Sequence, residues 1–504
     1  MPISRFVLSS PTCYERFDLP GNSPMIDSGW IVDAVLAFND FVIFYFISLN
    51  TIYLMLLVLS IGAAMRFARE TFFSDSQQIL ESDLTLPISV IVAARNEELT
   101  ILETVRSLMR VNYREFEVIV VNDASTDGTL ETLVSAYGLR KVDRVAKRSL
   151  ETQSIHAVYG SASQGNIILV DKEQGGKPDA LNAAINFSRY PLICSIDADS
   201  VIEPDALLRV VKPFVTHPGE TVAAGGIVRI INGCQIEDGV VKNVALSNRA
   251  LPILQAVEYL RGFLAGRMGW DAIQSLLIIS GAFGVYRKET VIRAGGYSGK
   301  TDSEDLELVV RMRRMLRAEK KSFRMAFVPD PVCWTEVPTK FGDLARQRSR
   351  WHRGLIQTLW SERKMLFNPR YGRVGLFVMP YFVLFEMLGP FVETLGYITI
   401  LVSYIMGSLD REYLLLFLSV SVFYGVFLSA AAVLLEEVWF RRYPNWLDVL
   451  KLLVFSLIEN LGYRQALSLF KIKAFWDLLL RRRGWGDIER IRFLPAEHDG
   501  KRSR

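Results

Sequence analysis

Two carboxylates stand two residues apart at the end of a predicted strand. Residues 195–200 read SIDADS and overlap an apolar run at 192–196 that has the pattern of a buried β-strand. Alternation along an extended chain would aim Asp197 and Asp199 to one side. Oxygen ligands that converge on one point suit Mg²⁺ or Mn²⁺, which could then neutralise a diphosphate. A solvated turn is the alternative, and the place after a buried strand favours metal binding over it.

Another carboxylate follows an earlier apolar strand. Residues 118–129 read VIVVNDASTDGT, so that a strand ends in Asn122 and Asp123 before a polar turn leads into a helix. Since ligands bind at the carboxyl ends of parallel strands, Asp123 could accept hydrogen bonds from a nucleobase or a ribose. Asp123 and Asp127 could equally cap the following helix.

Two glycine-containing segments could bring the backbone close to a ligand. In GGKPDALN, residues 175–182, the glycines supply a flexible backbone and Pro178 suits the first turn of a helix. Lys177 at this helix start would lie where anions bind, which favours contact with a phosphate, although a solvent-facing lysine is the commoner case. SGAFG, residues 280–284, fits a close approach to a ligand and a tight structural turn equally well.

A third acidic group opens a helix. Residues 303–308 read SEDLEL and place Glu304 and Asp305 immediately before a helical pattern at 308–316. Acidic residues at a helix start are stabilised by the helix dipole, which is a sufficient structural reason for them. A carboxylate here could also act as a general base that removes the proton from an attacking hydroxyl. The local spacing does not choose between the two.

Cations and an indole come together in QRSRW, residues 347–351. Arg348 and Arg350 can pair with phosphate, while Trp351 offers a flat apolar face suited to a sugar ring. An amphipathic stripe of leucines follows at 355–366, so the segment could instead anchor at a membrane surface. Both interpretations can hold together.

The elements that must position these groups alternate along the middle of the chain. Apolar, β-rich runs at 88–92 and 116–121 predict strands, and hydrophobic residues at helical spacing predict a helix at 99–109 between them. A helix at 179–187 then leads to the strand at 192–196. Strand, crossover helix and strand in succession predict an α/β domain with a mainly parallel, Rossmann-like sheet.

The composition predicts a membrane-embedded part as well. The hydrophobic fraction of the 504 residues is 50%, which is high for a soluble protein. Residues 41–65 are apolar and long enough to cross a hydrocarbon core of about 30 Å. Arg66 and Arg69 follow directly, whereas the residues before this run carry several aspartates. The positive-inside rule therefore places the N-terminus outside and the central domain in the cytoplasm.

A second hydrophobic block begins near residue 374. Residues 374–406 exceed one untilted span and contain prolines and glutamates, so they fit either one kinked helix or a re-entrant segment with a helix. Residues 413–435 form a cleaner span, whereas the run at 446–476 carries charges and is interpreted as interfacial or weakly inserted. The predicted divisions are an extracytoplasmic segment (1–40), a transmembrane helix (41–65), a cytoplasmic domain (84–354), an interfacial amphipathic helix (355–373), a transmembrane and interfacial region (374–480) and a basic cytoplasmic tail (481–504).

Net charge indicates which class of partner the protein binds, and cysteine spacing indicates the state of its thiols. The net charge is only +4 and the basic residues lie beside hydrophobic runs, which argues against nucleic acid as a partner and for the lipid bilayer. The four cysteines are widely spaced, without a metal-binding or disulfide pattern, and predict reduced, mostly buried thiols.

Taken together, these motifs resemble those of family 2 inverting glycosyltransferases of the membrane-bound kind. This group contains the cellulose, chitin, hyaluronan and poly-N-acetylglucosamine synthases. The resemblance covers about residues 87–354, and the hydrophobic runs on either side match the layout of the family. It implies a GT-A fold, in which a Rossmann-like catalytic domain is flanked by transmembrane and interfacial helices.

The resemblance also implies how the donor is bound. The donor would be a UDP-sugar and the cofactor Mg²⁺ or Mn²⁺. Asp123 would contact the uridine, and Lys177 would contact the diphosphate region of the nucleotide. Asp197 and Asp199 would hold the metal-bound nucleotide.

For the transfer itself, the resemblance implies that Asp305, with Glu304 beside it, is the general base. Gln347 and Arg350 would hold the diphosphate, and Trp351 would contact the acceptor polysaccharide. The serine before the two acidic residues stands where the TED motif of the family has threonine, so that a hydroxyl is kept.

The expected activity is processive, inverting transfer of a hexose or an N-acetylhexosamine from a UDP-sugar to a growing β-linked polysaccharide, which the membrane helices could also export. The alternatives are a single transfer to a lipid phosphate carrier and an inactive membrane conduit or scaffold. The expected location is the plasma (inner) membrane of a bacterial cell, with several spans and a cytoplasmic catalytic domain.

Overall fold

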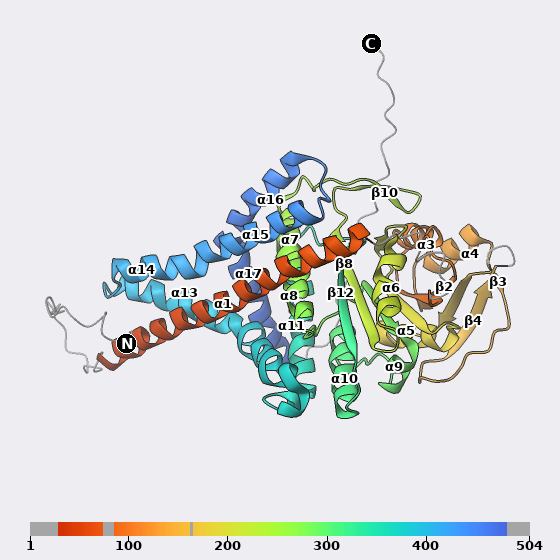
Figure 1. Cartoon of the computed structure of the whole chain (residues 1–504), viewed down its shortest axis with the longest axis horizontal. Helices are drawn as coiled ribbons and strands as arrows, with labels where there is room; N and C mark the ends of the chain where they lie inside the picture. The colour runs from red at the N-terminus through yellow and green to blue at the C-terminus, as the bar shows by residue number, and fades with distance from the viewer. Residues whose placement is uncertain (1–28, 74–84, 162–164, 481–504) are drawn as a thin grey trace, which may run out of the picture.

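The computed structural model describes residues 29–73, 85–161 and 165–480, which form an α/β part and a helical part (Figure 1). The sheet and its helices lie on the right of Figure 1, and long helices from both ends of the described chain gather on the left. The predicted N-terminal segment up to residue 28 and the basic tail at 481–504 lie outside the described residues. Three of the cysteines are described, and all three are buried free thiols, as expected.

A ten-stranded mixed sheet forms the α/β part. In spatial order its strands are β3 (Arg140–Lys141), β4 (Ile155–Gly160), β5 (Ile167–Lys172), β2 (Phe116–Asp123), β1 (Ile88–Ala94), β6 (Leu192–Asp197), β11 (Phe283–Arg287), β8 (Thr221–Ile230), β12 (Arg324–Thr335) and β7 (Ser200–Ile202). The strands β5, β2, β1 and β6 run parallel, with Val90 opposite both Val118 and Cys194. Their carboxyl ends therefore meet at one edge of the sheet, where α/β folds bind ligands.

The central strands are apolar along nearly their whole length because helices cover the sheet. Every residue of β1 except Ala93 is buried, and β2 is buried from Glu117 to its end. The helices of this part are α3 (Ile101–Met109), α4 (Thr129–Tyr137), α5 (Lys177–Phe187), α6 (Ala206–Thr216), α9 (Lys288–Arg293) and α10 (Glu304–Ala318). A small hairpin of β9 (Gln235–Glu237) and β10 (Val240–Asn243) stands apart from the sheet. The α/β fold and its predicted central strands and helices are confirmed.

The helical part is built around the long helix α1 (Gly29–Phe73). It packs against α8 (Arg267–Ala272), α13 (Gly389–Ile405) and α15 (Tyr424–Trp439). The remaining helices are α7 (Ala250–Tyr259), α11 (Phe341–Ser361), α12 (Met379–Tyr381), α14 (Arg411–Leu418), α16 (Trp446–Ile458) and α17 (Arg464–Leu479). A π-helical segment, Leu260–Gly266, joins α7 to α8.

Two helices in the described part of the chain are long and apolar enough to cross a membrane, Asp33–Arg69 and Arg411–Trp439. They contain both of the clean spans predicted from the sequence. The helices Val374–Met387 and Gly389–Ile405 meet at a bend of 44° and would form a third span if they cross together. Large apolar side chains remain exposed along these helices, as on Phe44 and Ile405, and such a surface suits lipid better than water.

The predicted division between the catalytic domain and an interfacial helix at 355–373 does not coincide with a helix boundary. The single helix α11 (Phe341–Ser361) contains both QRSRW and the leucines that follow it. Short 3₁₀ turns follow it at Arg363–Met365 and Pro369–Tyr371. One helix therefore connects the cavity described below with the membrane part.

Candidate active site

A cavity of about 1670 Å³ lies at the carboxyl ends of β1, β2 and β6 and extends toward the helical part. Every residue that the sequence singled out for chemistry lines it: Asp123, Lys177, Asp197, Asp199, Glu304, Asp305, Gln347, Arg348, Arg350 and Trp351. The fold thus brings together segments that are far apart in the chain.

Asp123, at the end of β2, is 2% exposed and already binds groups of the protein. Lys172 Nζ and the N–H of Gly175 donate to its Oδ1, each at 2.9 Å, and the N–H of Gly176 donates to its Oδ2 at 2.7 Å. Gly176 has a φ of +83°, and a Cβ on Gly175 would lie 2.5 Å from Asp179, so neither position accommodates a side chain easily. Asp123 therefore positions the glycine loop that precedes α5. Contact with a uridine would use the acceptor capacity that remains on Oδ2.

Lys177 connects two of the acidic motifs. Its Nζ lies 2.6 Å from Asp197 Oδ1 and 2.9 Å from Glu304 Oε1. Burial by itself lowers the pKa of Lys177, but these two carboxylates outweigh burial and raise the pKa well above its ordinary value. Lys177 is therefore a fixed cation at the place where the sequence predicts a diphosphate.

Asp197 and Asp199 present carboxylates at the end of β6. The side chain of Asp197 is 31% exposed, and its Oδ1 already holds a cation, the ammonium group of Lys177. Within the described ranges, no group of three or more His, Cys, Asp or Glu residues is arranged to hold a metal ion. One or two carboxylates are the usual protein share when Mg²⁺ is also held by substrate phosphates. The pair therefore fits a divalent cation that is shared with a nucleotide diphosphate.

Asp305 lies in the first turn of α10, held by backbone groups. The N–H of Gly281 donates to its Oδ2 and the N–H of Leu306 to its Oδ1, both at 2.8 Å. Burial, and then the charge of Glu304, raise the pKa of Asp305 above its ordinary value, against the opposing effects of Lys177 and the Gly281 N–H. A higher pKa makes a carboxylate a stronger proton acceptor, as a general base requires. A Cβ on Gly281 would come within 3.3 Å of Asp305 and Lys177, so SGAFG is a close approach of backbone to the site.

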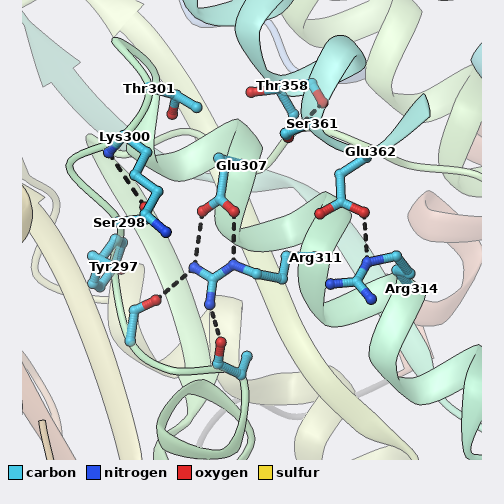
Figure 2. Close-up of polar contacts among 12 residues, drawn as sticks. Tyr297, Ser298, Lys300, Thr301, Glu307, Arg311, Arg314, Thr358, Ser361 and Glu362 are labelled. Atoms are coloured by element: carbon cyan, nitrogen blue, oxygen red, sulfur yellow. Dashed lines mark hydrogen bonds and ion pairs between the residues drawn. The ribbon is translucent and has the colours of Figure 1, made fainter. Parts of the chain in front are cut away.

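Ion pairs hold α10 in place behind this turn (Figure 2). Arg311 donates to both carboxylate oxygens of Glu307, at 2.7 and 2.8 Å, and also to two backbone carbonyls of the loop at 294–296. Arg314 pairs at 2.5 Å with Glu362, just after α11. The helix that carries the acidic motif is therefore fixed to the loop before it and to α11.

The helix α11 also packs tightly against the residues that precede Asp305. A Cβ on Gly354 would lie 2.1 Å from Ser303 Oγ, so only glycine permits this approach. Arg353 Nε donates to Asp302 Oδ2 at 2.7 Å, and the N–H of Asp302 donates to Gln357 Oε1 at the same distance. The helix that carries QRSRW therefore positions the general-base candidate as well.

Arg348 also lines the cavity, and its guanidinium group is already paired within the protein, so the predicted contact with phosphate stays a prediction. It is 3% exposed, pairs with Glu258 at 2.8 Å, and its guanidinium carbon lies 4.3 Å from the centre of the Trp351 ring. Tyr463 donates to the same carboxylate of Glu258 at 2.8 Å. Local sequence spacing does not reveal this partly buried carboxylate partner. Arg350 is on the cavity wall as well.

The segment 250–272 forms a wall of the cavity that sequence reasoning did not single out. It contributes Glu258, Tyr259, Phe263 and Arg267 to the lining. The signal that could have found it is a set of charged residues inside an otherwise apolar helical pattern, because such charges are buried only when they are paired or functional.

The same cavity continues between helices of the membrane part. Tyr53, Tyr381, Phe385, Glu386 and Arg464 line this region. Tyr53 and Tyr381 both donate to Glu386 Oε1, at 3.4 and 2.8 Å. Ionisable residues inside a helical bundle mark a path for polar ligands, since they are costly to place against lipid.

The cavity therefore places carboxylates and cations at the ends of parallel strands, where α/β folds bind ligands, next to helices of membrane length. Residues 86–354 match the model described as glycosyltransferase like family 2, and the chain belongs to this family of nucleotide-sugar transferases. The matched region includes every site residue predicted from the sequence.

Curated relatives narrow the comparison to polysaccharide synthases. The chain is 25% identical over 311 residues to the poly-beta-1,6-N-acetyl-D-glucosamine synthase of Staphylococcus aureus (strain COL), covering 60% of this chain and 64% of the relative. It is 26% identical over 282 residues to the synthase of the same name from Staphylococcus epidermidis, covering 55% of this chain and 57% of the relative. The chain therefore spans less than two thirds of the length of these relatives.

The solved structures that align with the chain are more distant in sequence. A mannosyltransferase from Pyrobaculum calidifontis, in complex with GDP-Man and Mn²⁺, aligns with a TM-score of 0.48 at 18% identity, covering 82% of this chain and 99% of that one. Staphylococcus aureus TarS 1–349 in complex with UDP aligns with a TM-score of 0.38 at 16% identity, covering 75% of this chain and 92% of that one.

Proposed function

We propose that this protein is a processive, inverting glycosyltransferase that adds sugars from a UDP-sugar to a growing β-linked polysaccharide at the cytoplasmic face of a membrane. One observation carries the proposal: the residues of the family motifs line a single cavity that continues between the membrane helices. An N-acetylhexosamine is the first sugar to test, because the curated relatives are poly-β-1,6-N-acetylglucosamine synthases.

The donor would bind at the ends of β2 and β6. Lys177 supplies a cation beside Asp197, and Arg350 of the QRSRW motif supplies another on the cavity wall. The diphosphate can pair with both cations. Gln347 adds a side-chain amide to the same wall. A divalent cation bound by Asp197 and Asp199 would add positive charge that stabilises the departing diphosphate.

The transfer step is a single displacement in which Asp305 acts as the general base. The acceptor hydroxyl attacks the anomeric carbon, and its proton passes to Asp305 as the new carbon–oxygen bond forms. The bond from the anomeric carbon to the diphosphate breaks on the opposite face, and UDP leaves with the electron pair. Because the hydroxyl attacks from the face opposite to the leaving diphosphate, the configuration at the anomeric carbon is inverted, and an α-linked donor gives a β-linkage.

Trp351 would hold the terminal sugar of the acceptor. An aromatic face supplies apolar contact without fixing one pattern of hydroxyl groups, so a chain can advance after each addition. Arg348 and Glu258 hold the ring in place. The growing chain would then enter the polar path between the membrane helices and leave the cell by that route.

The test is synthesis by the purified full-length protein in lipid nanodiscs. It would be incubated with Mg²⁺ and a panel of radiolabelled UDP-sugars, and the product would be digested with linkage-specific hydrolases. We expect one UDP-sugar to give a long polymer that a β-specific hydrolase degrades, and the Asp305→Asn variant to give none. Transfer of one sugar to a lipid phosphate, or UDP binding without UDP release, would contradict the proposal and support one of the two alternatives.

A further inference from the structure

Arg267 is a buried cation of the cavity wall that has no hydrogen-bond or ion-pair partner in the described part of the chain. It opens α8, is 8% exposed and lines the cavity. Among the residues that the structure describes, none forms a hydrogen bond or an ion pair with its guanidinium group. Its contact is with the face of Phe263, whose ring centre lies 4.2 Å from the guanidinium carbon.

Other buried arginines of the described chain differ from Arg267 in this respect. Arg229, Arg348 and Arg353 each have a carboxylate partner within 2.8 Å, namely Glu436, Glu258 and Asp302. Arg313 instead donates to the backbone carbonyls of Gln274 and Leu276. Burial lowers the pKa of Arg267 to about 10, and the charge of Asp305 only partly offsets this effect, so the side chain is still cationic at neutral pH. An unpaired buried charge is costly to the folded protein, and a ligand that pairs with it would remove this cost.

The position of Arg267 indicates which ligand group it meets. Phe263, which contacts Arg267, is also next to the predicted acceptor platform, since its ring centre is 6.2 Å from that of Trp351. The charge of Asp305 raises the pKa of Arg267, so the two side chains are within electrostatic range of each other. Through Phe263, Arg267 is next to Trp351, on the predicted acceptor side of the cavity.

We propose that Arg267 is a specificity-determining residue that binds a carbonyl-type oxygen on the terminal sugar of the acceptor, either the acetamido oxygen of an N-acetylhexosamine or the carboxylate of a uronic acid. This inference rests on the proposed function and names the substituent that the acceptor must carry. A guanidinium group donates up to five hydrogen bonds and accepts none, so it favours an oxygen that only accepts. The acceptor sugar would lie on Trp351 with its hydroxyl toward Asp305 and its substituent toward Arg267.

The experiment measures binding of short oligosaccharides to the full-length protein in the absence of donor. The probes are β-linked oligomers of N-acetylglucosamine, of glucose and of a uronic acid, all of one length. The variants are Arg267→Met, which keeps the length of the side chain without its charge, and Arg267→Lys, which keeps the charge without the planar fork. Arg249→Met is the matched control, because Arg249 is exposed just before α7 and does not line the cavity.

We expect Arg267→Met to weaken binding of the preferred substituted oligomer by about 10- to 100-fold, the scale of a lost charge-assisted hydrogen bond. Arg267→Lys should retain part of the affinity, and Arg249→Met all of it. Binding of the glucose oligomer and of UDP should not change in any variant. The unmodified protein should prefer either the N-acetylglucosamine oligomer or the uronic acid oligomer, and Arg267→Met should lose this preference. Which oligomer is preferred identifies the oxygen that Arg267 binds.

Thermal unfolding of the ligand-free protein separates this role from a structural one. The Arg267→Met variant should unfold at the same temperature as the unmodified protein or higher, since it removes an unpaired buried charge. A lower unfolding temperature, equal weakening for all three oligomers, or loss of UDP affinity would overturn the proposal. If the protein releases no UDP from any UDP-sugar, the proposed polymerase function fails, while the donor-free binding data still decide the role of Arg267.

Discussion

Asp305 and Asp197 are carboxylates of one cavity, yet their surroundings give them different chemistry. Backbone N–H groups hold Asp305, and burial raises its pKa, which suits the uptake of a proton. Asp197 instead pairs with the cation of Lys177 at 2.6 Å, which suits a group that binds positive charge. Substitution of each should therefore change a different step.

Asp305→Asn should lower sugar transfer by about 10²-fold or more, because the general base is lost while the ground-state contacts of the donor remain. UDP affinity should stay the same. The thermal stability should not fall, since the ionised carboxylate is disfavoured where it is buried. In the unmodified protein, transfer should decline as the pH falls through the raised pKa of Asp305, because the protonated carboxyl cannot accept a proton. Single-turnover transfer and UDP titration check these points, and near-normal turnover of the variant would refute the role.

Chelation by EDTA should abolish transfer, and Mg²⁺ or Mn²⁺ should restore it, if Asp197 and Asp199 share a cation with the diphosphate. Asp197→Asn should weaken UDP binding as well as turnover, since a metal ligand acts in the ground state too. Asp143→Asn, at an exposed position outside the cavity, is the control and should change neither. Full activity after thorough chelation would rule out the metal role.

At the scale of elements, α11 connects the cavity wall around Trp351 with the loop that leads to Asp305. It carries Gln347, Arg350 and Trp351 on the cavity wall, and its next turn packs against the loop that leads to Asp305. This contact between α11 and the loop depends on the absence of a Cβ atom at Gly354. A small shift of α11 would therefore move Trp351 and Asp305 together.

Gly354→Ala should force Ser303 and α11 apart, because the added Cβ would lie 2.1 Å from Ser303 Oγ. We expect the free energy of unfolding to fall by about 1–3 kcal/mol, as in other overpacked sites, and transfer to fall further than UDP binding. Gly342→Ala in the first turn of the same helix is the matched control, since its Cβ would meet no atom within 4 Å. Thermal unfolding and transfer assays compare the two variants, and equal behaviour would show that the close packing does not matter.

At the scale of the whole molecule, the cavity belongs to both parts of the fold. It begins at the ends of parallel strands and is lined further on by α1, α13 and α17, which come from opposite ends of the described chain (Figure 1). A product formed at Asp305 would have a polar route between these helices. Synthesis and transport could thus share one space.

Export can be measured in proteoliposomes with the catalytic domain on the outside. UDP-sugar added outside should yield a polymer that an added hydrolase cannot degrade until detergent opens the vesicles. The Asp305→Asn variant should give no product in the same vesicles, which controls for trapped radiolabel. A polymer that is degraded without detergent would show that synthesis occurs without transport.

Much of the site was predictable because its motifs are local. The acidic pair at the end of β6, the glycine loop before α5 and the acidic start of α10 follow from residue types at strand ends and helix starts, where side chains project into a crevice. Hydrophobic periodicity likewise predicted the central strands and the two clean membrane spans. The sequence predicted both Asp305 and Trp351 as site residues, but it could not show that they line the same cavity.

The sequence by itself determined the α/β class, the family and the candidate residues, because composition, period and motif spacing are properties of neighbouring positions. The tertiary structure decided which side chains meet. Arg348 contacts Glu258 and Trp351, and Gly354 packs against Ser303. Arg267 has no hydrogen-bond or ion-pair partner among the described residues. These relations depend on which distant segments pack together and how far each charge is removed from water, and only the folded chain sets both.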